Sequence, residues 1–246
     1  MPKFAADPNG SVKSTFGFSA VDISSLGATE YTLVSLVVDN SGSVASFGKE
    51  EEKAIKEIVS ACRRSPRADN LMLRYIRFDD KVEELHGFKL LQDCNPGDYD
   101  NTIPGGGMTA LFDSSVNGVD ALARYGRELQ TNDFTANGIL FVITDGGNNA
   151  GLNRSPASVR KSIQQALMGE NLESLVSVLI GVNVQDKGLA SLLETFAKEA
   201  GFTQYVEIAN ANEKSLAKLA EFVSKSISSQ SQALGTGGPS QQLPTF

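Results

Sequence analysis

The chain has 246 residues, of which 41% are hydrophobic and 21% are charged, a balance typical of globular proteins rather than disordered ones. Its 22 Lys and Arg residues are outnumbered by 29 Asp and Glu residues, and the net charge of −7 argues against a sequence-independent nucleic-acid binder. No apolar stretch approaches the roughly 20 residues that cross a bilayer, and residues 1–7 lack the apolar segment of a secretory signal. We therefore expect a cytoplasmic protein without membrane contacts.

The first third of the chain predicts one buried strand followed by a helix. Residues 1–30 are rich in Ser and Gly and predict an extended lead-in with one edge strand at most. Residues 32–38 form a near-continuous β-prone run that stops at Asp39, as a central strand buried on both faces would. An amphipathic helix follows, marked by apolar residues at helical spacing: Ala54, Ile55, Ile58, Val59 and Cys62.

The middle and the end of the chain alternate strands with helices. A strand at 71–78 and a tight turn at Asp79-Asp80 predict an antiparallel third strand near 82–88, because parallel pairs need a long crossover. Further buried strands are predicted at 138–144, 175–182 and 204–208, separated by helical patterns within 111–123, 159–167, 189–197 and 216–227. This alternation predicts the α/β class, with a mostly parallel sheet and helices on both faces.

The composition changes near the C-terminal end of the sequence. We predict a lead-in over residues 1–30, one folded domain over residues 31–228 and a flexible tail over residues 229–246. The tail is rich in Ser, Gln, Gly, Thr and Pro, has no charged residue, and cannot bury enough surface to offset its ordering entropy. It is either a solubilising end or a docking peptide, whose anchors would be Leu243, Pro244 and Phe246.

The cysteines and the histidine point away from redox, zinc and triad chemistry. Cys62 and Cys94 lack metal-ligand spacing, and we expect two unpaired thiols rather than one disulfide. His86 is the single histidine, so a Ser-His-Asp or Cys-His mechanism would have to use it. Its neighbours suggest a strand end, and we expect a structural role.

Polar residues follow the predicted strands at one edge of the sheet. The run Asp39-Asn40-Ser41-Gly42-Ser43 comes directly after the first central strand. Thr109 follows the Gly-rich loop 104–108, and Asp145 follows the strand that ends at Thr144. Because ligands of open α/β sheets bind outside the carboxyl ends of the strands, these loops are the candidate site.

The chemistry of these loops is that of a hard divalent cation. Asp39, Ser41, Ser43, Thr109 and Asp145 offer carboxylate and hydroxyl oxygens, which suit Mg²⁺, Mn²⁺ or Ca²⁺ rather than zinc or copper. Two carboxylates would just neutralise the ion and leave it electrophilic. Since Mg²⁺ takes about six ligands, a position stays open for an external carboxylate, such as an acidic residue of a protein partner.

Each of the three loops also has a plain structural explanation. Ser43 and Thr109 could be helix N-caps, and Asp145-Gly146 could be a simple turn. Their joint placement after successive elements of one sheet edge favours a site over three independent coincidences.

The three motifs together resemble the metal-ion-dependent adhesion site (MIDAS) of von Willebrand factor type A domains. The resemblance covers roughly residues 30–228 and includes all five metal-site positions in order, with Met108 inserted between Gly107 and Thr109. It implies a Rossmann-like, doubly wound sheet of six strands, mostly parallel, with one antiparallel edge strand. It also implies that Ser41 and Ser43 ligate the ion directly.

By the same resemblance, Asp39 and Asp145 would act directly or through water, and Thr109 would join or leave with the bound state. The implied protein is a stand-alone intracellular member of the family that captures a Glu or Asp carboxylate of a partner. Its setting would be a larger complex, such as one with an AAA+ ATPase or a kinase–phosphatase pair.

Two other functions stay open from the sequence. A Mg²⁺-dependent phosphatase of the haloacid-dehalogenase kind also places an Asp after its first strand, but it needs a second acid where this chain has Ser41. No phosphate-binding Gly-rich motif of a nucleotide-binding enzyme is present. The second alternative is a structural scaffold that uses no metal.

Overall fold

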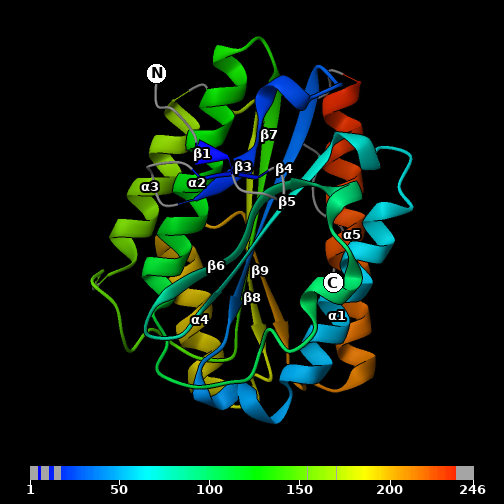
Figure 1. Ribbon diagram of the computed structural model, residues 1–246. Helices are drawn as coiled ribbons and strands as arrows, with labels where there is room; N and C mark the ends of the chain where they lie inside the picture. The colour runs from blue at the N-terminus through cyan, green and yellow to red at the C-terminus, as the bar shows by residue number, and fades with distance from the viewer. Residues whose placement is uncertain (1–4, 7–10, 14–17, 154, 170, 237–246) are drawn as a thin grey trace.

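The computed structural model describes residues 5–6, 11–13, 18–153, 155–169 and 171–236. Its strands are β1 (Ala5–Ala6), β2 (Ser11–Lys13), β3 (Ser19–Val21), β4 (Glu30–Asp39), β5 (Leu71–Phe78), β6 (Val82–Leu90), β7 (Thr135–Thr144), β8 (Leu175–Val182) and β9 (Gln204–Ile208). Its α-helices are α1 (Gly48–Arg63), α2 (Leu111–Thr131), α3 (Pro156–Met168), α4 (Lys187–Ala200) and α5 (Glu213–Gly235). Helices α2, α3 and α4 cover one face of the sheet, and α1 and α5 cover the other (Figure 1).

The described strands form one sheet in the order β1-β2-β3-β6-β5-β4-β7-β8-β9. Strands β5, β4, β7, β8 and β9 are parallel to one another, and β6 runs antiparallel to β5. The predicted α/β class, with its Rossmann-like and mostly parallel sheet, is confirmed. The carboxyl ends of the parallel strands gather at the bottom of the molecule in Figure 1, where the arrows of β8 and β9 point.

The antiparallel strand β6 is not the edge of the sheet, contrary to the sequence-based expectation. Strand β3 pairs parallel with β6 through Ala20 and Phe88, and β2 and β1 continue antiparallel beyond β3. The lead-in thus supplies three short strands instead of one. The contact depends on Gly87, because a Cβ at this position would lie 1.8 Å from the backbone oxygen of Ser19.

A partly buried ion pair supports the same junction. The backbone N–H and the hydroxyl of Ser19 both donate to Glu84 Oε1, at 2.8 and 2.7 Å. The other oxygen of Glu84 accepts from Nε of Arg74, which is 1% exposed, at 2.7 Å. Strands of three residues have few ladder bonds of their own, so these side-chain contacts help hold β3 in place.

Strand β4 lies between two hydrophobic cores. Its alternate residues Val34, Leu36 and Val38 pack toward α1 and α5, whereas Leu33 and Val37 pack toward α2, α3 and α4. This is the two-residue alternation of a strand buried on both faces. The predicted apolar stripe of α1 (Ala54, Ile55, Ile58, Val59 and Cys62) is buried against the first of these cores.

Helix α5 continues into the segment that the sequence assigns to a flexible tail. Residues 229–235 form its last two turns, and Gln230 and Ser231 are fully buried. The side-chain amide of Asn137 on β7 donates to the backbone oxygen of Gln230 at 3.1 Å, which ties this end to the sheet. Small Ser and Ala side chains let the helix approach closely, so a composition poor in large apolar residues still packs. Residues 237–246, with Leu243, Pro244 and Phe246, lie outside the described residues.

Within the described ranges, no helix combines the length and the apolar character that a membrane span requires.

His86 and the two cysteines have structural surroundings. The ring of His86 contacts the backbone oxygen of Gly87 at 2.8 Å and the hydroxyl of Tyr99 at 2.9 Å. Burial lowers the pKa of His86 to about 4, so the ring is neutral at pH 7. Cys62 and Cys94 are free and buried, and burial raises their thiol pKa values to about 12 and about 11. These groups are therefore poor candidates for catalysis.

The β3–β6 junction can be tested with one methyl group. We expect Gly87→Ala to lower the free energy of unfolding by about 1–3 kcal/mol, because the new Cβ overlaps the backbone of β3. Urea denaturation measures this loss. Gly27→Ala is the matched control, since a Cβ there meets nothing within 4 Å. Equal stabilities of the two variants would contradict the role given to Gly87.

Candidate metal centre

The candidate site begins with Asp39, the last residue of β4. Its side chain is 1% exposed, and both of its carboxylate oxygens accept hydrogen bonds from the protein. Oδ1 accepts from the backbone N–H of Ser41 at 2.8 Å, and Oδ2 accepts from the hydroxyl of Thr144 at 2.5 Å. Because Thr144 ends β7, these bonds join the carboxyl ends of two neighbouring parallel strands.

The two serines lie in a short 3-10 turn between β4 and α1. The turn spans Gly42–Ser46, and α1 begins at Gly48 with Phe47 at its N-cap position. Ser43 is therefore not the cap of α1. Its hydroxyl is exposed, donates to Asp145 Oδ1 at 2.8 Å and lies 3.2 Å from the hydroxyl of Ser41.

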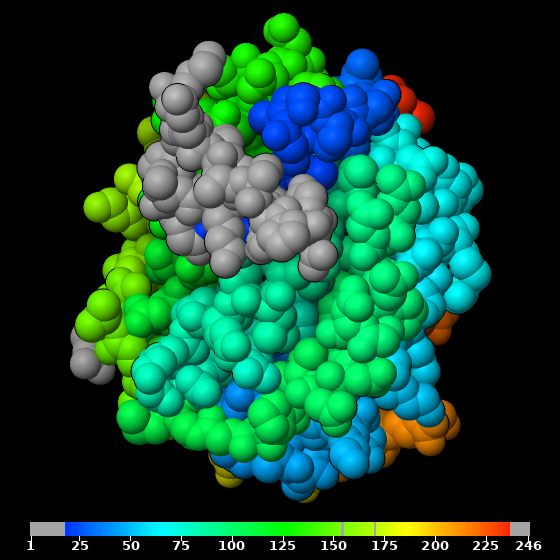
Figure 2. Space-filling view, in the orientation of Figure 1, coloured from blue at the N-terminus to red at the C-terminus, as the bar shows by residue number. Residues whose placement is uncertain are grey.

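Asn40 fastens the Gly-rich loop to this turn. Its side-chain oxygen accepts the N–H of Gly105 at 2.9 Å, and its backbone oxygen accepts the N–H of Gly106 at 2.8 Å. Gly105 has a φ of +74°, and a Cβ there would lie 2.6 Å from Ala45. Only glycine fits this close approach. Figure 2 shows the segment of residues 91–107 packed over the front of the molecule and reaching its bottom end, beside the turn at residues 42–46.

Thr109 follows this loop and is 4% exposed. Its N–H donates to the side-chain oxygen of Asn149 at 2.6 Å, and its backbone oxygen accepts the N–H of Asn149 at 3.0 Å. Helix α2 starts only at Leu111, with Ala110 at the N-cap, so Thr109 does not cap it. A Cβ placed on Gly146 would lie 3.7 Å from the Thr109 hydroxyl oxygen, so that hydroxyl lies against the Asp145–Gly146 loop.

The structure thus brings the five predicted residues to one end of the sheet. Three residues that hold this arrangement were not predicted from the sequence: Asn40, Thr144 and Asn149. All three lie in, or directly border, the loops at the carboxyl ends of the strands. A search of those loops for amide and hydroxyl side chains would have found them.

Proteins of known structure share the fold of this chain. No protein-family model and no curated protein matches the chain. The PilB minor pilin from Streptococcus sanguinis has a similar structure, with a TM-score of 0.60 and 16% identity over 86% of this chain and 64% of that one. The pilus adhesin SpaC from Lactobacillus rhamnosus GG matches with a TM-score of 0.60 and 11% identity over 93% of this chain and 36% of that one.

A third similar structure carries a metal in the corresponding type of site. Proximal thread matrix protein 1 from the mussel byssus, in a form with a zinc-occupied MIDAS motif, gives a TM-score of 0.53 and 22% identity over 81% of this chain and 46% of that one. The chain has a von Willebrand factor type A fold. It spans less than two thirds of the length of each of these three proteins.

In this type A fold the site carries negative charge that the protein does not neutralise. Burial raises the pKa of Asp39 to about 6, although hydrogen bonds from Thr144 and Ser41 oppose the shift. Burial also raises the pKa of Asp145. Among the described residues, the ion pairs include neither carboxylate. A cation at this end of the sheet would favour both ionised forms.

The donor set fits such a cation only with its hydroxyls included. In the described part of the chain, no three His, Cys, Asp or Glu side chains gather as a metal-binding group. Ser41 and Ser43, joined by Thr109 in the partner-bound state, would therefore supply much of the coordination, with Asp39 and Asp145 supplying charge. Neutral hydroxyls and carboxylates are the ligands that Mg²⁺ and Ca²⁺ prefer.

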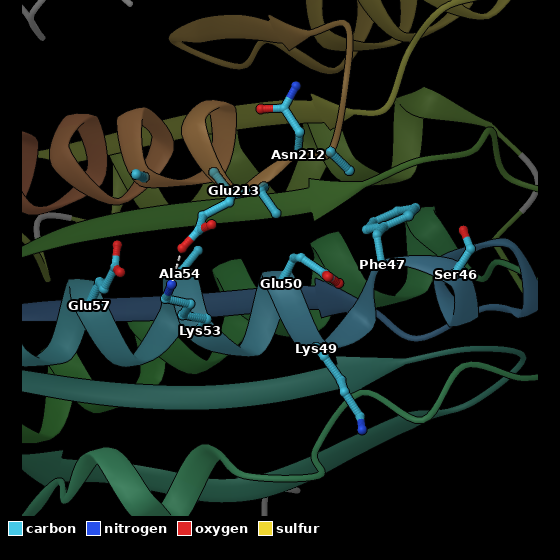
Figure 3. Close-up of a pocket in the computed structure, with 12 residues that line it drawn as sticks. Ser46, Phe47, Lys49, Glu50, Lys53, Ala54, Glu57, Asn212 and Glu213 are labelled. Carbon is cyan, nitrogen blue, oxygen red and sulfur yellow. Dashed lines mark hydrogen bonds and ion pairs between the residues drawn. The ribbon is translucent and has the colours of Figure 1, made fainter.

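A separate hollow of about 540 Å³ lies between α1 and α5. Figure 3 shows the Lys53–Glu213 ion pair crossing it, with Glu50 and Asn212 beside this pair. None of the five candidate ligands lines the hollow, and its polar groups carry charges of both signs. This hollow is therefore not the metal centre.

The raised pKa of Asp39 predicts a pH-dependent stability of the metal-free protein. A carboxyl group whose pKa is raised by folding lowers the free energy of unfolding above that pKa, and this penalty vanishes below its unfolded value. In EDTA we expect the free energy of unfolding of the wild type, relative to that of Asp39→Asn, to fall by about 2–3 kcal/mol between pH 4 and pH 7.5, since about two pKa units separate the folded and unfolded states. Most of this change should lie between pH 4 and pH 6. Urea denaturation in pH steps measures it.

Asp69→Asn, at an exposed position outside the site, is the control for this series. A difference between Asp39→Asn and the wild type that stays constant from pH 7.5 to pH 4 would contradict the assignment to Asp39.

Proposed function

We propose that this type A fold is a metal-dependent protein-binding module. A divalent cation bound by Asp39, Ser41, Ser43, Thr109 and Asp145 would capture an Asp or Glu carboxylate of a protein partner. The observation that carries the proposal is the convergence of the exposed Ser43 hydroxyl with Ser41 and Asp145, in front of a buried Asp39.

The hydrogen bonds of Asp39 suggest how the roles are divided. Both of its oxygens already accept bonds from Ser41 and Thr144, so Asp39 is better placed to act through water than to ligate directly. The hydroxyls of Ser41 and Ser43 would then contact the ion. Because these hydroxyls are neutral, the ion keeps enough charge to attract a further carboxylate.

The surface around the site supports a protein partner. Met108, Leu152 and Leu192 are 54%, 91% and 51% exposed, although large apolar side chains are usually buried. Met108 precedes Thr109, Leu152 follows the Asp145 loop, and Leu192 would be 2.9 Å from a Cβ on Gly147. Exposed apolar groups around a polar centre are typical of protein-binding surfaces.

The named neighbours favour the same class of function. They are described as a pilin, a pilus adhesin and a thread matrix protein, and one of them has zinc in its MIDAS motif. For this chain we favour Mg²⁺, or Mn²⁺ or Ca²⁺, because the ligand set is oxygen only. The AAA+ ATPase or kinase–phosphatase setting and the cytoplasmic location stay predictions.

The phosphatase alternative fits the geometry less well. A nucleophilic aspartate needs a free oxygen facing the substrate, whereas Asp39 is 1% exposed and both of its oxygens accept hydrogen bonds. The position of the second acid is taken by Ser41, whose N–H donates to Asp39. We therefore propose a binding protein rather than an enzyme, and assays for phosphatase and ATPase activity test that choice.

Metal binding is tested first by thermal stability. We expect Mg²⁺ at 100 times its Kd to raise the Tm by about 5–10 °C, because the ion binds only the folded state. Asp39→Ala should remove this shift, and Asp69→Ala should keep it. If none of Mg²⁺, Mn²⁺ and Ca²⁺ changes the Tm of the wild type, the alternative of a structural scaffold that uses no metal is favoured.

Partner capture tests the second half of the proposal. Proteins retained by the immobilised chain in Mg²⁺ should be lost both in EDTA and with Asp39→Ala. We expect Thr109→Ala to weaken retention about tenfold, the worth of one charge-assisted contact, while Mg²⁺ affinity changes less than about threefold. Equal losses of partner and metal affinity would show that Thr109 does not act in the bound state.

A further inference from the structure

A third buried carboxylate belongs to the helix that follows the serine turn of the candidate site. Glu51, in the first turns of α1, is 2% exposed. Backbone bonds connect it to the serine turn: the N–H of Glu51 donates to Phe47, that of Phe47 to Val44 and that of Val44 to Ser41, at 3.1, 2.9 and 3.1 Å. The position of Glu51 is therefore fixed relative to Ser41.

The carboxylate of Glu51 is not satisfied by the protein. Its Oε2 is enclosed and has no hydrogen-bond partner, and no ion pair among the described residues includes Glu51. Burial raises the pKa of Glu51 well above its usual range, and the negative charges of Asp39 and Asp145 raise it further. A buried acceptor without a donor is costly, and such groups mark places where a ligand or ion belongs.

The adjacent glutamates show that this is not a general property of α1. Glu50 is exposed and lines the hollow between α1 and α5 (Figure 3). Glu52 is 7% exposed, but its Oε1 accepts the N–H of Ile103 at 2.7 Å. Of the two buried glutamates, Glu51 is the one left with an enclosed oxygen that nothing bonds.

We propose that Glu51 is a positioning residue of the metal centre, a third carboxylate whose ionised form strengthens cation binding without ligating the ion. The proposal rests on the proposed metal site. Glu51 would act through its field, or through water, and not as a direct ligand, because no three carboxylates of the described chain gather around one point.

Glu51 would have opposite effects on two properties of the protein: it would raise the affinity for a cation and lower the stability of the metal-free fold. With a cation bound, the charge of Glu51 is compensated and raises the affinity for the ion. Without a cation, burial and the charges of Asp39 and Asp145 oppose the ionisation of the same group, and the cost of enclosing it lowers the stability of the fold. A glutamate with a purely structural role would show only one of these effects.

The test compares Glu51→Gln with Glu52→Gln, which removes the other buried charge of α1 and leaves an acceptor for Ile103. Mg²⁺ affinity is measured by isothermal titration calorimetry, and the Tm is measured in EDTA. We expect Glu51→Gln to weaken Mg²⁺ binding about tenfold or more and to raise the Tm in EDTA by about 2–4 °C. Glu52→Gln should change Mg²⁺ affinity less than about twofold. Glu51→Met, which has no polar atom to leave unbonded, should reproduce both effects of Glu51→Gln.

Three results would contradict the role of Glu51. If the wild type and Glu51→Gln bind Mg²⁺ with the same affinity, the role of Glu51 is overturned and the metal site stands. If Glu51→Gln and Glu52→Gln weaken Mg²⁺ binding equally, the effect belongs to the net charge of α1 and the role of Glu51 is again overturned. If the wild type binds no divalent cation, both proposals fall.

Discussion

The arrangement of the loops at the carboxyl ends of the strands depends on the buried carboxyl group of Asp39. Asp39 is buried at the point where β4 leaves the sheet, and its two oxygens accept bonds from Ser41 on its own loop and from Thr144 on the next strand. These bonds set the direction in which the chain turns after β4. They also keep the carboxyl ends of β4 and β7 in register, so that the Ser43 hydroxyl reaches Asp145. In the proposed metal centre, a bound cation would offset the cost of burying this charge.

The remaining loops are held by bonds that leave the site's own oxygens available. Asn40 fixes the Gly-rich loop through Gly105 and Gly106. Asn149 fixes Thr109 by its backbone and not by its hydroxyl. The bonds by which Asn40 and Asn149 hold these two loops thus use no side-chain oxygen of the five candidate ligands. This arrangement agrees with a binding site and not with three unrelated turns.

Much of the fold could be predicted from the sequence, because β4, β7 and β8 are buried apolar runs and the helices have apolar stripes at helical spacing. The end of α5 was missed because its buried face consists of Ser, Gln and Ala, which have no hydrophobic signature. The lead-in was given one edge strand at most instead of three, because strands of two or three residues show no period and because the pairing of β3 depends on the absence of a side chain at Gly87. The five candidate ligands could be named because parallel strands bring their carboxyl ends together. Glu51 was not named, although it lies three and four residues before Ala54 and Ile55 and so falls on the buried stripe of α1. An acidic residue on an apolar stripe is the signal that would have revealed it.

The two hydrogen bonds between Thr109 and Asn149 couple the motions of these residues. One hydrogen bond joins the backbone of Thr109 to the side chain of Asn149, and another joins the two backbones. A small displacement of Thr109 toward an ion would therefore move Asn149 as well. Asn149 lies in the same loop as Leu152, whose N–H donates to a side-chain oxygen of Asp113 on α2 at 2.6 Å. Binding of a cation at the proposed centre would therefore also shift the loop that carries the exposed side chain of Leu152. The surface that meets a partner would then differ between the metal-free and the metal-bound protein.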